Sequence, residues 1–278
     1  MIWRRFDLSN KVALVVGGRG FLGQRFATAL SECGARVYAA DLPEPSRAAA
    51  HDPARPDGGS DISQRTVDVS DPGSVQSLVS AIMTEASRID ILIYSVTTKP
   101  QDFYQPFTEC SLEGWRQLMR VELDGLFLVA QQVGRVMETA GGGSMMFLSS
   151  VYGVVGNDQR IYEGANLAQL YAGAPHDPSK RLYSHAGYAA VKGAVIALTR
   201  FLAAYWGDRG IRVNCISPGG IAHPGEDAGF VERYSARVPM GRKAASDDVS
   251  GAVVYLASDA SAYVTGHNLV IDGGLTAW

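Results

Sequence analysis

A glycine-rich loop between a buried strand and a helix constrains this chain most. Val12–Val16 is an unbroken apolar run, Gly17, Gly20 and Gly23 follow it, and a helical pattern continues from about residue 21 to residue 33. Glycines at these places permit a tight turn, close approach of the backbone to a pyrophosphate, and close helix–strand packing. The helix N-terminus offers N–H groups and a favourable dipole to phosphates. In this context, the loop predicts a dinucleotide-binding βαβ unit rather than a turn alone.

The rest of the chain repeats this alternation of short apolar runs and longer helical patterns. Apolar strands joined by helices imply crossover connections and a parallel sheet covered on both faces. The chain has no internal repeat and no clear linker, so we expect a single α/β domain over residues 1–278. Strands are predicted at residues 12–16, 36–40, 66–69, 89–96, 144–149, 211–217 and 268–271, and helices near residues 21–33, 71–87, 111–139, 183–206 and 246–258.

Two stretches interrupt this alternation. Residues 42–60 are rich in Pro, Ala and Gly and are expected to form a surface loop. Residues at about 154–183 form a long polar insertion that contains several aromatic side chains. Because long ordered loops on such sheets are often functional, we expect the second stretch to be ordered.

Charge and cysteine content exclude several classes of protein. The formal net charge of −3 gives no electrostatic reason to expect nucleic acid or an anionic membrane as a partner. The first apolar run, Val12–Val16, is too short for a secretion signal or a membrane span. Cys33, Cys110 and Cys215 lie far apart and suggest neither a disulfide framework nor a metal site. We therefore expect a cytoplasmic protein.

A carboxylate at the end of the second predicted strand bears on the choice of dinucleotide. Asp41 can accept hydrogen bonds from both hydroxyls of an adenosine ribose and would repel a 2′-phosphate, although an Asp here can also cap the next segment. Arg19 acts in the opposite direction, because a guanidinium can pair with a 2′-phosphate. Asp41 has the more direct geometry, so NAD is predicted, with NADP as the weaker alternative. Asp68 is predicted either to contact adenine or to cap the next helix.

A tyrosine and a lysine form the predicted catalytic pair. Tyr188 and Lys192 are four residues apart in the helix near residues 183–206, and therefore share one face. A free phenol has a pKa near ~10, and an adjacent ammonium favours its deprotonated form. The tyrosine can then exchange a proton with an alcohol or carbonyl oxygen as hydride moves, while the lysine also holds the nicotinamide ribose. By itself such a pair fits a structural role equally well; its place after the fifth strand favours catalysis.

Two turns at strand ends complete the predicted site. Ser150, after the fifth strand, can donate a hydrogen bond to the reacting oxygen, whereas Ser149 is expected to bond backbone groups of the turn. After the sixth strand, the segment from Pro218 through Gly219 to Ile221 either presents its backbone to the nicotinamide carboxamide or is a plain structural turn. Both turns lie where open α/β sheets bind ligands.

These motifs, in this order, resemble those of the short-chain dehydrogenase/reductase family. The resemblance extends from Lys11 to Gly274 and includes the Asp68–Val69 pair, the run 211–219 and the closing segment 272–274. It implies one doubly wound Rossmann domain with a seven-stranded parallel sheet, catalytic roles for Ser150, Tyr188 and Lys192, and a homotetramer or homodimer built on the helices flanking the fifth strand. The predicted cofactor contacts are Gly17, Arg19, Gly20, Phe21, Leu22, Gly23, Asp41, Asp68, Val69, Ser95, Tyr188, Lys192, Pro218, Gly219 and Ile221.

The chain departs from the family in several places. Val16 stands where the common branch has Thr, and the glycine spacing is closer to the extended, epimerase-like branch. Residues 94–97 replace the Asn-Asn-Ala-Gly motif. Glu122 takes the position of the family's catalytic-relay Asn, whose backbone carbonyl holds a water near the lysine. Glu122 can preserve that role, and its carboxylate would also affect protonation of the Tyr–Lys pair, so the resemblance leaves Glu122 unassigned.

The insertion points to a polyhydroxylated substrate such as a sugar, amino sugar or sugar nucleotide. Its sequence is similar to that of a subgroup associated with bacterial surface-glycan and flagellin-modification sugar pathways. The side chains that can bond hydroxyls or a phosphate are Asp158, Gln159, Arg160, Tyr162, Glu163 and Asn166. Packing of the insertion at a subunit interface is the alternative.

Two other functions fit parts of the sequence. An epimerase or dehydratase is suggested by the glycine spacing, but the short chain after Lys192 leaves little room for a separate sugar-nucleotide domain. A non-catalytic module that senses dinucleotide has no need of Ser150, Tyr188 and Lys192 together. An NAD(P)-dependent oxidoreductase acting on a carbinol or carbonyl carbon is therefore the favoured interpretation.

Overall fold

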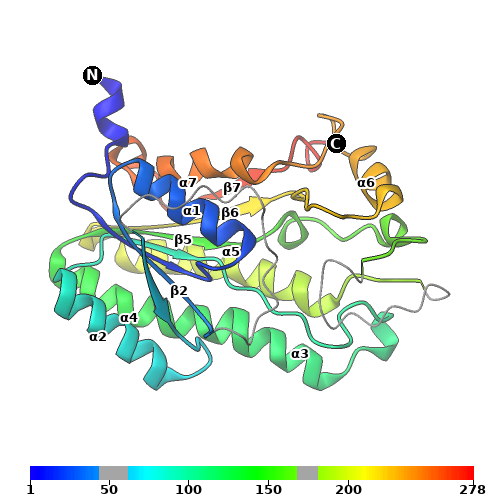
Figure 1. Cartoon of the computed structure of the whole chain (residues 1–278), viewed down its shortest axis with the longest axis horizontal. Helices are drawn as coiled ribbons and strands as arrows, with labels where there is room; N and C mark the ends of the chain where they lie inside the picture. Colours follow the sequence, from blue (N-terminus) through cyan, green and yellow to red (C-terminus); the bar gives the residue numbers. More distant parts are fainter. Residues whose placement is uncertain (44–61, 168–180) are drawn as a thin grey trace.

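The computed structural model describes residues 1–43, 62–167 and 181–278, and it is built on a seven-stranded sheet (Figure 1). All neighbouring strands are parallel, in the order β3-β2-β1-β4-β5-β6-β7. The predicted seven-stranded parallel sheet is confirmed. The strands are β1 (Val12–Val16), β2 (Arg36–Asp41), β3 (Ile62–Thr66), β4 (Ile91–Tyr94), β5 (Gly143–Leu148), β6 (Ile211–Pro218) and β7 (Asn268–Ile271).

Helices cover both faces of the sheet. α1 and α7 lie on one face, and α2, α4 and α5 lie on the other (Figure 1). Along β1, the side chains alternate between the two layers: Ala13 and Val15 pack with α1 and α7, whereas Leu14 and Val16 pack with the opposite layer. The helices are α1 (Phe21–Glu32), α2 (Pro72–Ala86), α3 (Leu112–Leu118), α4 (Gly125–Ala140), α5 (Ala186–Trp206), α6 (Ala228–Ser235) and α7 (Ser250–Ala257).

Helix α5 carries the predicted catalytic pair and is unusually apolar. By length and composition it could cross a membrane, as the core helices of many globular proteins also could. Its buried side chains, including Val191, Val195 and Ile196, pack in the core layer beneath the sheet. The apolar face of α5 is therefore explained by packing within the domain.

The third strand lies earlier in the chain than predicted. We expected it at residues 66–69, but β3 is Ile62–Thr66, and the chain then turns through Asp68 into α2. Because β3 is at the edge of the sheet, it needs no continuous apolar run, and its residues are mostly half-buried or exposed. The buried Val67 and Val69, which suggested a strand, instead lie just beyond its end.

The long helix predicted at residues 111–139 is interrupted by a π-helical turn, η3 (Met119–Asp124), between α3 and α4. Such turns insert an extra residue and rotate the side chains that follow, and they are frequent at functional sites. Glu122 lies in this turn and is buried. The π turn thus gives Glu122 a position that a regular helix would not predict.

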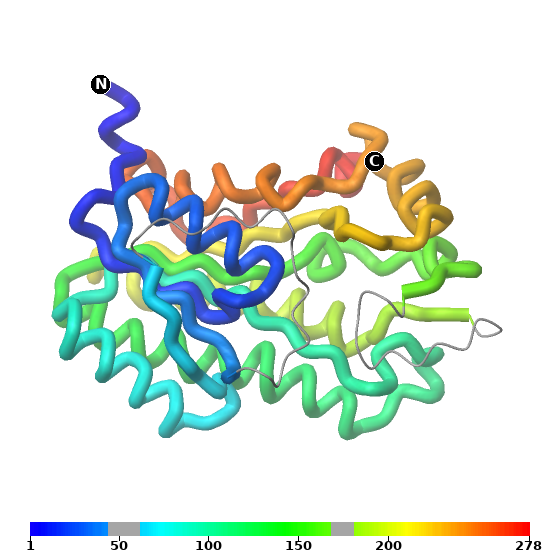
Figure 2. Tube along the Cα trace, viewed as in Figure 1, coloured from blue at the N-terminus to red at the C-terminus, as the bar shows by residue number. Residues whose placement is uncertain are grey.

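The carboxyl ends of the strands meet at one edge of the sheet, where the chain order reverses between β1 and β4. Open α/β sheets bind ligands at this edge. The described part of the insertion, residues 154–167, runs beside α6, which the sequence did not predict (Figure 2). Most of the expected 42–60 loop and residues 168–180 of the insertion lie outside the described residues.

Candidate active site

The glycine loop has the geometry that a bound pyrophosphate requires. Gly17 has φ +83°, and a Cβ there would lie 2.5 Å from the carbonyl oxygen of Ser95. A Cβ on Gly23 would lie 2.0 Å from the carbonyl oxygen of Gly17, so α1 packs closely on the loop. α1 begins at Phe21 with Gly20 as its N-cap. Because glycine has no side chain to cap the helix, the N–H groups of the first turn suit phosphate binding.

The first two helical residues have different surroundings. The Phe21 ring lies against the His223 imidazole, with 4.0 Å between the ring centroids. The backbone of Phe21, rather than its ring, therefore fits the predicted cofactor contact. Leu22 packs against the core layer shared by α1 and α7. His223, from the segment after β6, was not singled out by sequence reasoning.

Asp41 ends β2 with its carboxylate turned toward the glycine loop. Its two oxygens accept hydrogen bonds from the N–H groups of Arg19 (3.0 Å) and Leu42 (2.9 Å). The remaining lone pairs of an oriented carboxylate can accept hydrogen bonds from ribose hydroxyls. The Arg19 guanidinium donates to the Leu42 carbonyl (3.0 Å) and to the Gln64 side chain (3.3 Å). The groups that favour NAD and NADP are thus both at the end of β2.

Asp68, Val69 and Ser95 follow β3 and β4. The Asp68 carboxylate accepts hydrogen bonds from the Ser70 N–H (2.9 Å) and hydroxyl (2.7 Å). Helix α2 is capped by Asp71 instead, so the N-cap alternative for Asp68 is wrong. Val69 is buried, and Ser95 donates its N–H to the end of β1 (2.8 Å).

Two serines follow β5 and make different contacts. Ser149 donates its hydroxyl to the backbone carbonyl of Lys192 (2.7 Å), as expected for a structural serine. The Ser150 hydroxyl accepts a hydrogen bond from the Tyr152 N–H (3.2 Å). A hydroxyl that accepts one hydrogen bond can still donate its own hydrogen, which fits the role predicted for Ser150.

Tyr188 and Lys192 lie together on α5, as their spacing predicts. The Lys192 Nζ lies over the Tyr188 ring, 5.3 Å from its centroid, and donates to the Leu148 carbonyl at the end of β5 (3.2 Å). Lys192 is 4% exposed, whereas Tyr188 is partly exposed. The Lys192 ammonium is therefore held against the Tyr188 ring, between α5 and the end of β5.

Glu122 joins this pair through its side chain. Its Oε2 lies 2.8 Å from Lys192 Nζ, and its Oε1 accepts hydrogen bonds from the Thr97 hydroxyl (2.9 Å) and the Thr98 N–H (3.0 Å). Burial alone would lower the pKa of Lys192, but the charges of Glu122 and Tyr188 and the hydrogen bond to Glu122 together raise it. Sequence reasoning placed Glu122 near the pair without predicting this contact.

Two N–H groups of the turn after β6 form hydrogen bonds within the protein. The Gly219 N–H donates to the Ile271 carbonyl (2.8 Å), and the Gly220 N–H donates to the Tyr234 hydroxyl. That donor already has a partner within the protein, and the contact of Gly219 with the nicotinamide carboxamide stays a prediction. Pro218 and Ile221 remain predicted contacts at the end of β6.

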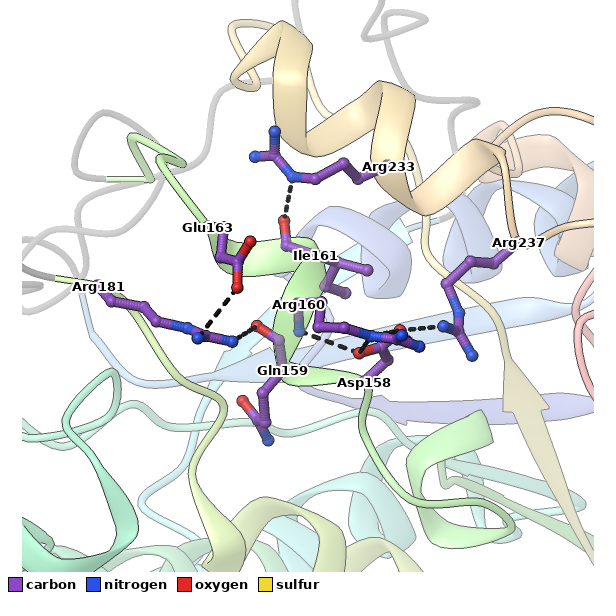
Figure 3. Close-up of polar contacts among 8 residues, drawn as sticks. All are labelled: Asp158, Gln159, Arg160, Ile161, Glu163, Arg181, Arg233 and Arg237. Atoms are coloured by element: carbon purple, nitrogen blue, oxygen red, sulfur yellow. Dashed lines mark hydrogen bonds and ion pairs between the residues drawn. The ribbon is translucent and has the colours of Figure 1, made fainter.

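The charged side chains of the insertion bind one another (Figure 3). The Asp158 carboxylate accepts hydrogen bonds from Arg160 (2.9 Å) and pairs with Arg237, while Glu163 pairs with Arg181 (3.0 Å). The Arg160 hydrogen bonds, aided by the Arg237 charge, lower the pKa of Asp158 to about 2. These groups were expected to bond substrate hydroxyls, but in the structure both carboxylates already pair with arginines of the insertion or of the segment after α6.

The remaining polar candidates of the insertion have different placements. Gln159 accepts a hydrogen bond from the Ser184 N–H (2.8 Å), and Asn166 is exposed. Tyr162 is buried. Of the residues proposed for the substrate, Tyr162 alone lies in the row of rings that leads to Tyr188.

A row of aromatic rings extends from Tyr188 to α6. Tyr188 contacts Phe103 (centroids 6.1 Å apart), Phe103 contacts Tyr104 (5.0 Å), and Tyr104 contacts Tyr162 (6.4 Å). Tyr162 in turn contacts Phe230 (5.5 Å). Sequence reasoning missed Phe103, Tyr104 and Phe230, because they come from separate segments with no shared motif.

A half-buried lysine borders this row. Lys99 Nζ lies 3.3 Å from the Tyr104 hydroxyl and 5.3 Å from the Phe103 ring centroid. Burial lowers the pKa of Lys99 well below its ordinary value, although the charges of Glu122 and Glu226 oppose the shift. Lys99 thus places an amine between the aromatic row and the Glu122 region.

Comparisons with known proteins agree with this geometry. Residues 19–170 and 179–276 match the family described as enoyl-(acyl carrier protein) reductase. D-threitol dehydrogenase of Mycolicibacterium smegmatis is 35% identical over 277 residues, covering 98% of this chain and 95% of the relative. NAD-dependent glycerol dehydrogenase of Listeria innocua is 31% identical over 277 residues, covering 98% of this chain and 96% of the relative.

A solved structure supports the same assignment. The gluconate 5-dehydrogenase of Burkholderia cenocepacia, in complex with NADP and tartrate, is 30% identical with a TM-score of 0.81, and the match covers 99% of this chain and 98% of the other. These relatives are dehydrogenases rather than epimerases or sensing modules. The chain therefore belongs to the short-chain dehydrogenase/reductase family and is an NAD(P)-dependent oxidoreductase that acts on CH–OH groups.

Proposed function

We propose that this protein oxidises one hydroxyl of a small polyol, with NAD preferred over NADP. The observation that carries the proposal is the double contact of Tyr188, which meets the Lys192 ammonium on one side and the aromatic row at Phe103 on the other. A substrate lying against these rings would have its hydroxyl beside the acid/base group.

Each catalytic residue has a defined role in this reaction. Tyr188, as a phenolate, takes the proton of the substrate hydroxyl. Ser150 donates a hydrogen bond to the same oxygen, and Lys192 stabilises the phenolate and holds the ribose. A bound nicotinamide would supply the acceptor for the hydride of the carbinol carbon. The alcohol thus loses one proton and one hydride and becomes a carbonyl compound, and Tyr188 is left protonated.

The choice of a small polyol rests on the relatives and on the aromatic row. The relatives are named for threitol, glycerol and gluconate. Tyrosine rings offer apolar faces to C–H groups and hydroxyls to the alcohol groups. The sequence of the insertion suggested a sugar nucleotide or surface-glycan substrate. This prediction has less support, because the carboxylates of the insertion already pair with arginines.

A sugar acid is the second candidate, and Lys99 favours it. Its amine lies beside the Tyr104 hydroxyl, and a substrate carboxylate bound there would favour the ammonium form that burial alone disfavours. Lys99→Met should then raise the KM for a sugar acid about tenfold while changing the KM for a neutral polyol of equal length little, since an ion pair here is worth roughly 1–2 kcal/mol. Equal changes for both substrates would remove the support for the acid.

The proposed function is tested by a substrate panel followed at the absorbance of reduced nicotinamide. The panel contains polyols of three to six carbons, the matching sugar acids and a sugar nucleotide, each with NAD and with NADP. Fastest turnover is expected for a polyol with NAD. Net turnover of the sugar nucleotide alone, or no reduced nicotinamide with any compound, would refute the proposal.

We also propose that the protein is a cytoplasmic homo-oligomer assembled through α4 and α5. Large apolar side chains are exposed there: Phe127 (52%), Phe201 (65%) and Tyr205 (50%). A second copy of the chain would cover this surface. Light scattering should give a dimer or tetramer for the wild type and a smaller species for Phe201→Glu. An unchanged mass for Phe201→Glu would contradict the proposed interface.

A further inference from the structure

The ion pair between Glu122 and Lys192 is almost completely buried. The Glu122 and Lys192 side chains are 1% and 5% exposed, with 2.8 Å between Oε2 and Nζ. Removing two charges from water is costly unless their geometry and additional hydrogen bonds compensate. A pair buried this deeply at the catalytic lysine therefore calls for a specific role.

The carboxylate is held from two sides. Its Oε1 accepts hydrogen bonds from Thr97 and Thr98, in the segment that follows β4, and its Oε2 faces α5. The π turn that carries Glu122 is itself anchored, because the Tyr94 hydroxyl donates to the Val121 carbonyl (2.7 Å). The carboxylate thus links the end of β4 to the catalytic lysine.

We propose that Glu122 is a positioning residue that fixes the Lys192 ammonium beneath Tyr188 and sets the pH range in which the pair exchanges its proton. This inference rests on the proposed function. Glu122 touches neither the substrate nor the reacting atoms in this account; it acts through Lys192.

The direction of the effect follows from charge. Lys192 favours a negative charge on the phenol, whereas the Glu122 carboxylate, 2.8 Å from the ammonium, opposes it. A neutral side chain at position 122 therefore removes the charge that opposes a negative phenol. The carboxylate also keeps Lys192 charged in a site where burial favours the neutral amine.

Other titratable groups lie near Glu122 and Tyr188, and burial favours the neutral form of each. Burial raises the pKa of the neighbouring tyrosines, so these phenols are neutral in the working range. Lys99 is the other nearby amine, and burial lowers its pKa well below the ordinary value. The groups facing the pair from adjoining segments are Tyr94, Lys99, Tyr152 and Tyr234.

The first test observes Lys192 directly, without turnover. The chain has only five lysines (Lys11, Lys99, Lys180, Lys192 and Lys243), so the full-length protein labelled with ¹³C at lysine Cε gives a simple spectrum that Lys192→Met assigns. In the wild type, the Lys192 signal should stay that of the ammonium beyond the pH at which an ordinary lysine titrates. In Glu122→Gln, its midpoint should fall by at least about one pH unit.

The second test is the pH profile of kcat/KM for alcohol oxidation. Glu122→Gln and Glu122→Asn should move the acidic limb to lower pH by about one unit, because the opposing charge is gone. Glu122→Asp keeps the charge and should bring the limb back toward the wild-type position. Glu113→Gln, which removes an exposed carboxylate on α3, should leave the profile unchanged.

The outcomes separate this inference from the proposed function. An unchanged Lys192 midpoint in Glu122→Gln overturns the positioning role, and an unchanged profile in both neutral variants overturns the role in pH dependence. If Glu122→Gln does not fold, Glu122→Asn replaces it as the neutral variant in both tests. A wild type that oxidises no substrate refutes the proposed function, while the lysine titration still decides whether Glu122 holds Lys192.

Discussion

The Lys192 ammonium lies over the Tyr188 ring, 5.3 Å from its centroid, and both residues belong to α5. A helix fixes this relationship more rigidly than a loop would, because four-residue spacing places the side chains one turn apart on the same face. The buried end of the pair contacts Glu122 and the exposed end contacts Phe103. Tyr188 and Lys192 thus connect the buried Glu122 carboxylate to the row of aromatic rings that begins at Phe103.

Replacing Lys192 should cost both activity and stability. Lys192→Met removes the ammonium, so kcat/KM should fall by about 10²-fold or more. It also leaves the Glu122 carboxylate buried without its partner, which costs roughly 3–5 kcal/mol of unfolding free energy. The double variant Lys192→Met/Glu122→Gln should regain most of that stability but none of the activity. Urea unfolding of the two variants measures this, and equal instability of both would contradict the account.

Adding one methyl group at Gly23 should weaken dinucleotide binding. Its Cβ would lie 2.0 Å from the Gly17 carbonyl oxygen, so α1 and the loop must separate in Gly23→Ala. Fluorescence titration with NADH should show an affinity at least about tenfold weaker, since a displaced loop loses contacts worth more than ~1.4 kcal/mol. Gly207→Ala is the matched control, because no atom lies within 4 Å of its Cβ position. Wild-type affinity in Gly23→Ala would exclude the loop as the phosphate site.

The preference for NAD should depend on Asp41 at the end of β2 and Arg19 in the glycine loop. Asp41→Asn removes the charge that repels a 2′-phosphate, so the ratio of kcat/KM with NADP to kcat/KM with NAD should rise about tenfold. Arg19→Met removes the competing cation and should lower the same ratio. Steady-state kinetics with both cofactors measures the two shifts. If neither variant changes the ratio, another part of the chain selects the cofactor.

Acid should weaken the start of α5 through His185. Its Nδ1 accepts a hydrogen bond from the Gly187 N–H (3.0 Å) and caps the helix. Burial lowers the pKa of His185 below 6.5, although the charge of Asp102 opposes the shift. The unfolded chain therefore binds this proton more readily, so stability is complete above pH 6.5 and is lost as the pH falls below it.

Thermal unfolding between pH 5 and pH 8 measures this effect. His185→Asn keeps a capping side chain without a titrating group, so its melting temperature should depend less on pH than that of the wild type. His267→Asn, at an exposed position, should retain the wild-type dependence. Equal dependence in all three proteins would remove His185 as the cause.

The fold could be predicted from the sequence where local pattern and burial coincide. The apolar run at β1 and the glycines after it occur together, and the buried strands β1 and β4 are apolar throughout. Edge strand β3 has only its polar residues to identify it, so its position was predicted too late in the chain. Helix α6 is short and carries few apolar residues, and it is held by contacts with the insertion that no local pattern shows.

The candidate site could be predicted only where residues carry motifs. Tyr188 and Lys192 are recognisable by spacing, but the partners of Glu122 depend on the π turn, which shifts the register of side chains within a helix that looks continuous in sequence. The pairing of Asp158 with Arg237 joins the insertion to a segment far along the chain. Such contacts follow from tertiary packing, so the sequence did not show that these charged side chains bind one another, and their contact with substrate stays a prediction.

The measurement that tests the central claim most directly compares Tyr188→Phe with the wild type. Rates of alcohol oxidation and NADH affinity should be determined on the same preparations. The account predicts that kcat/KM falls by about 10²–10⁴-fold while NADH affinity stays within about twofold, because only the proton-accepting oxygen is lost. Undiminished oxidation by Tyr188→Phe would contradict the claim and assign the proton transfer to another group.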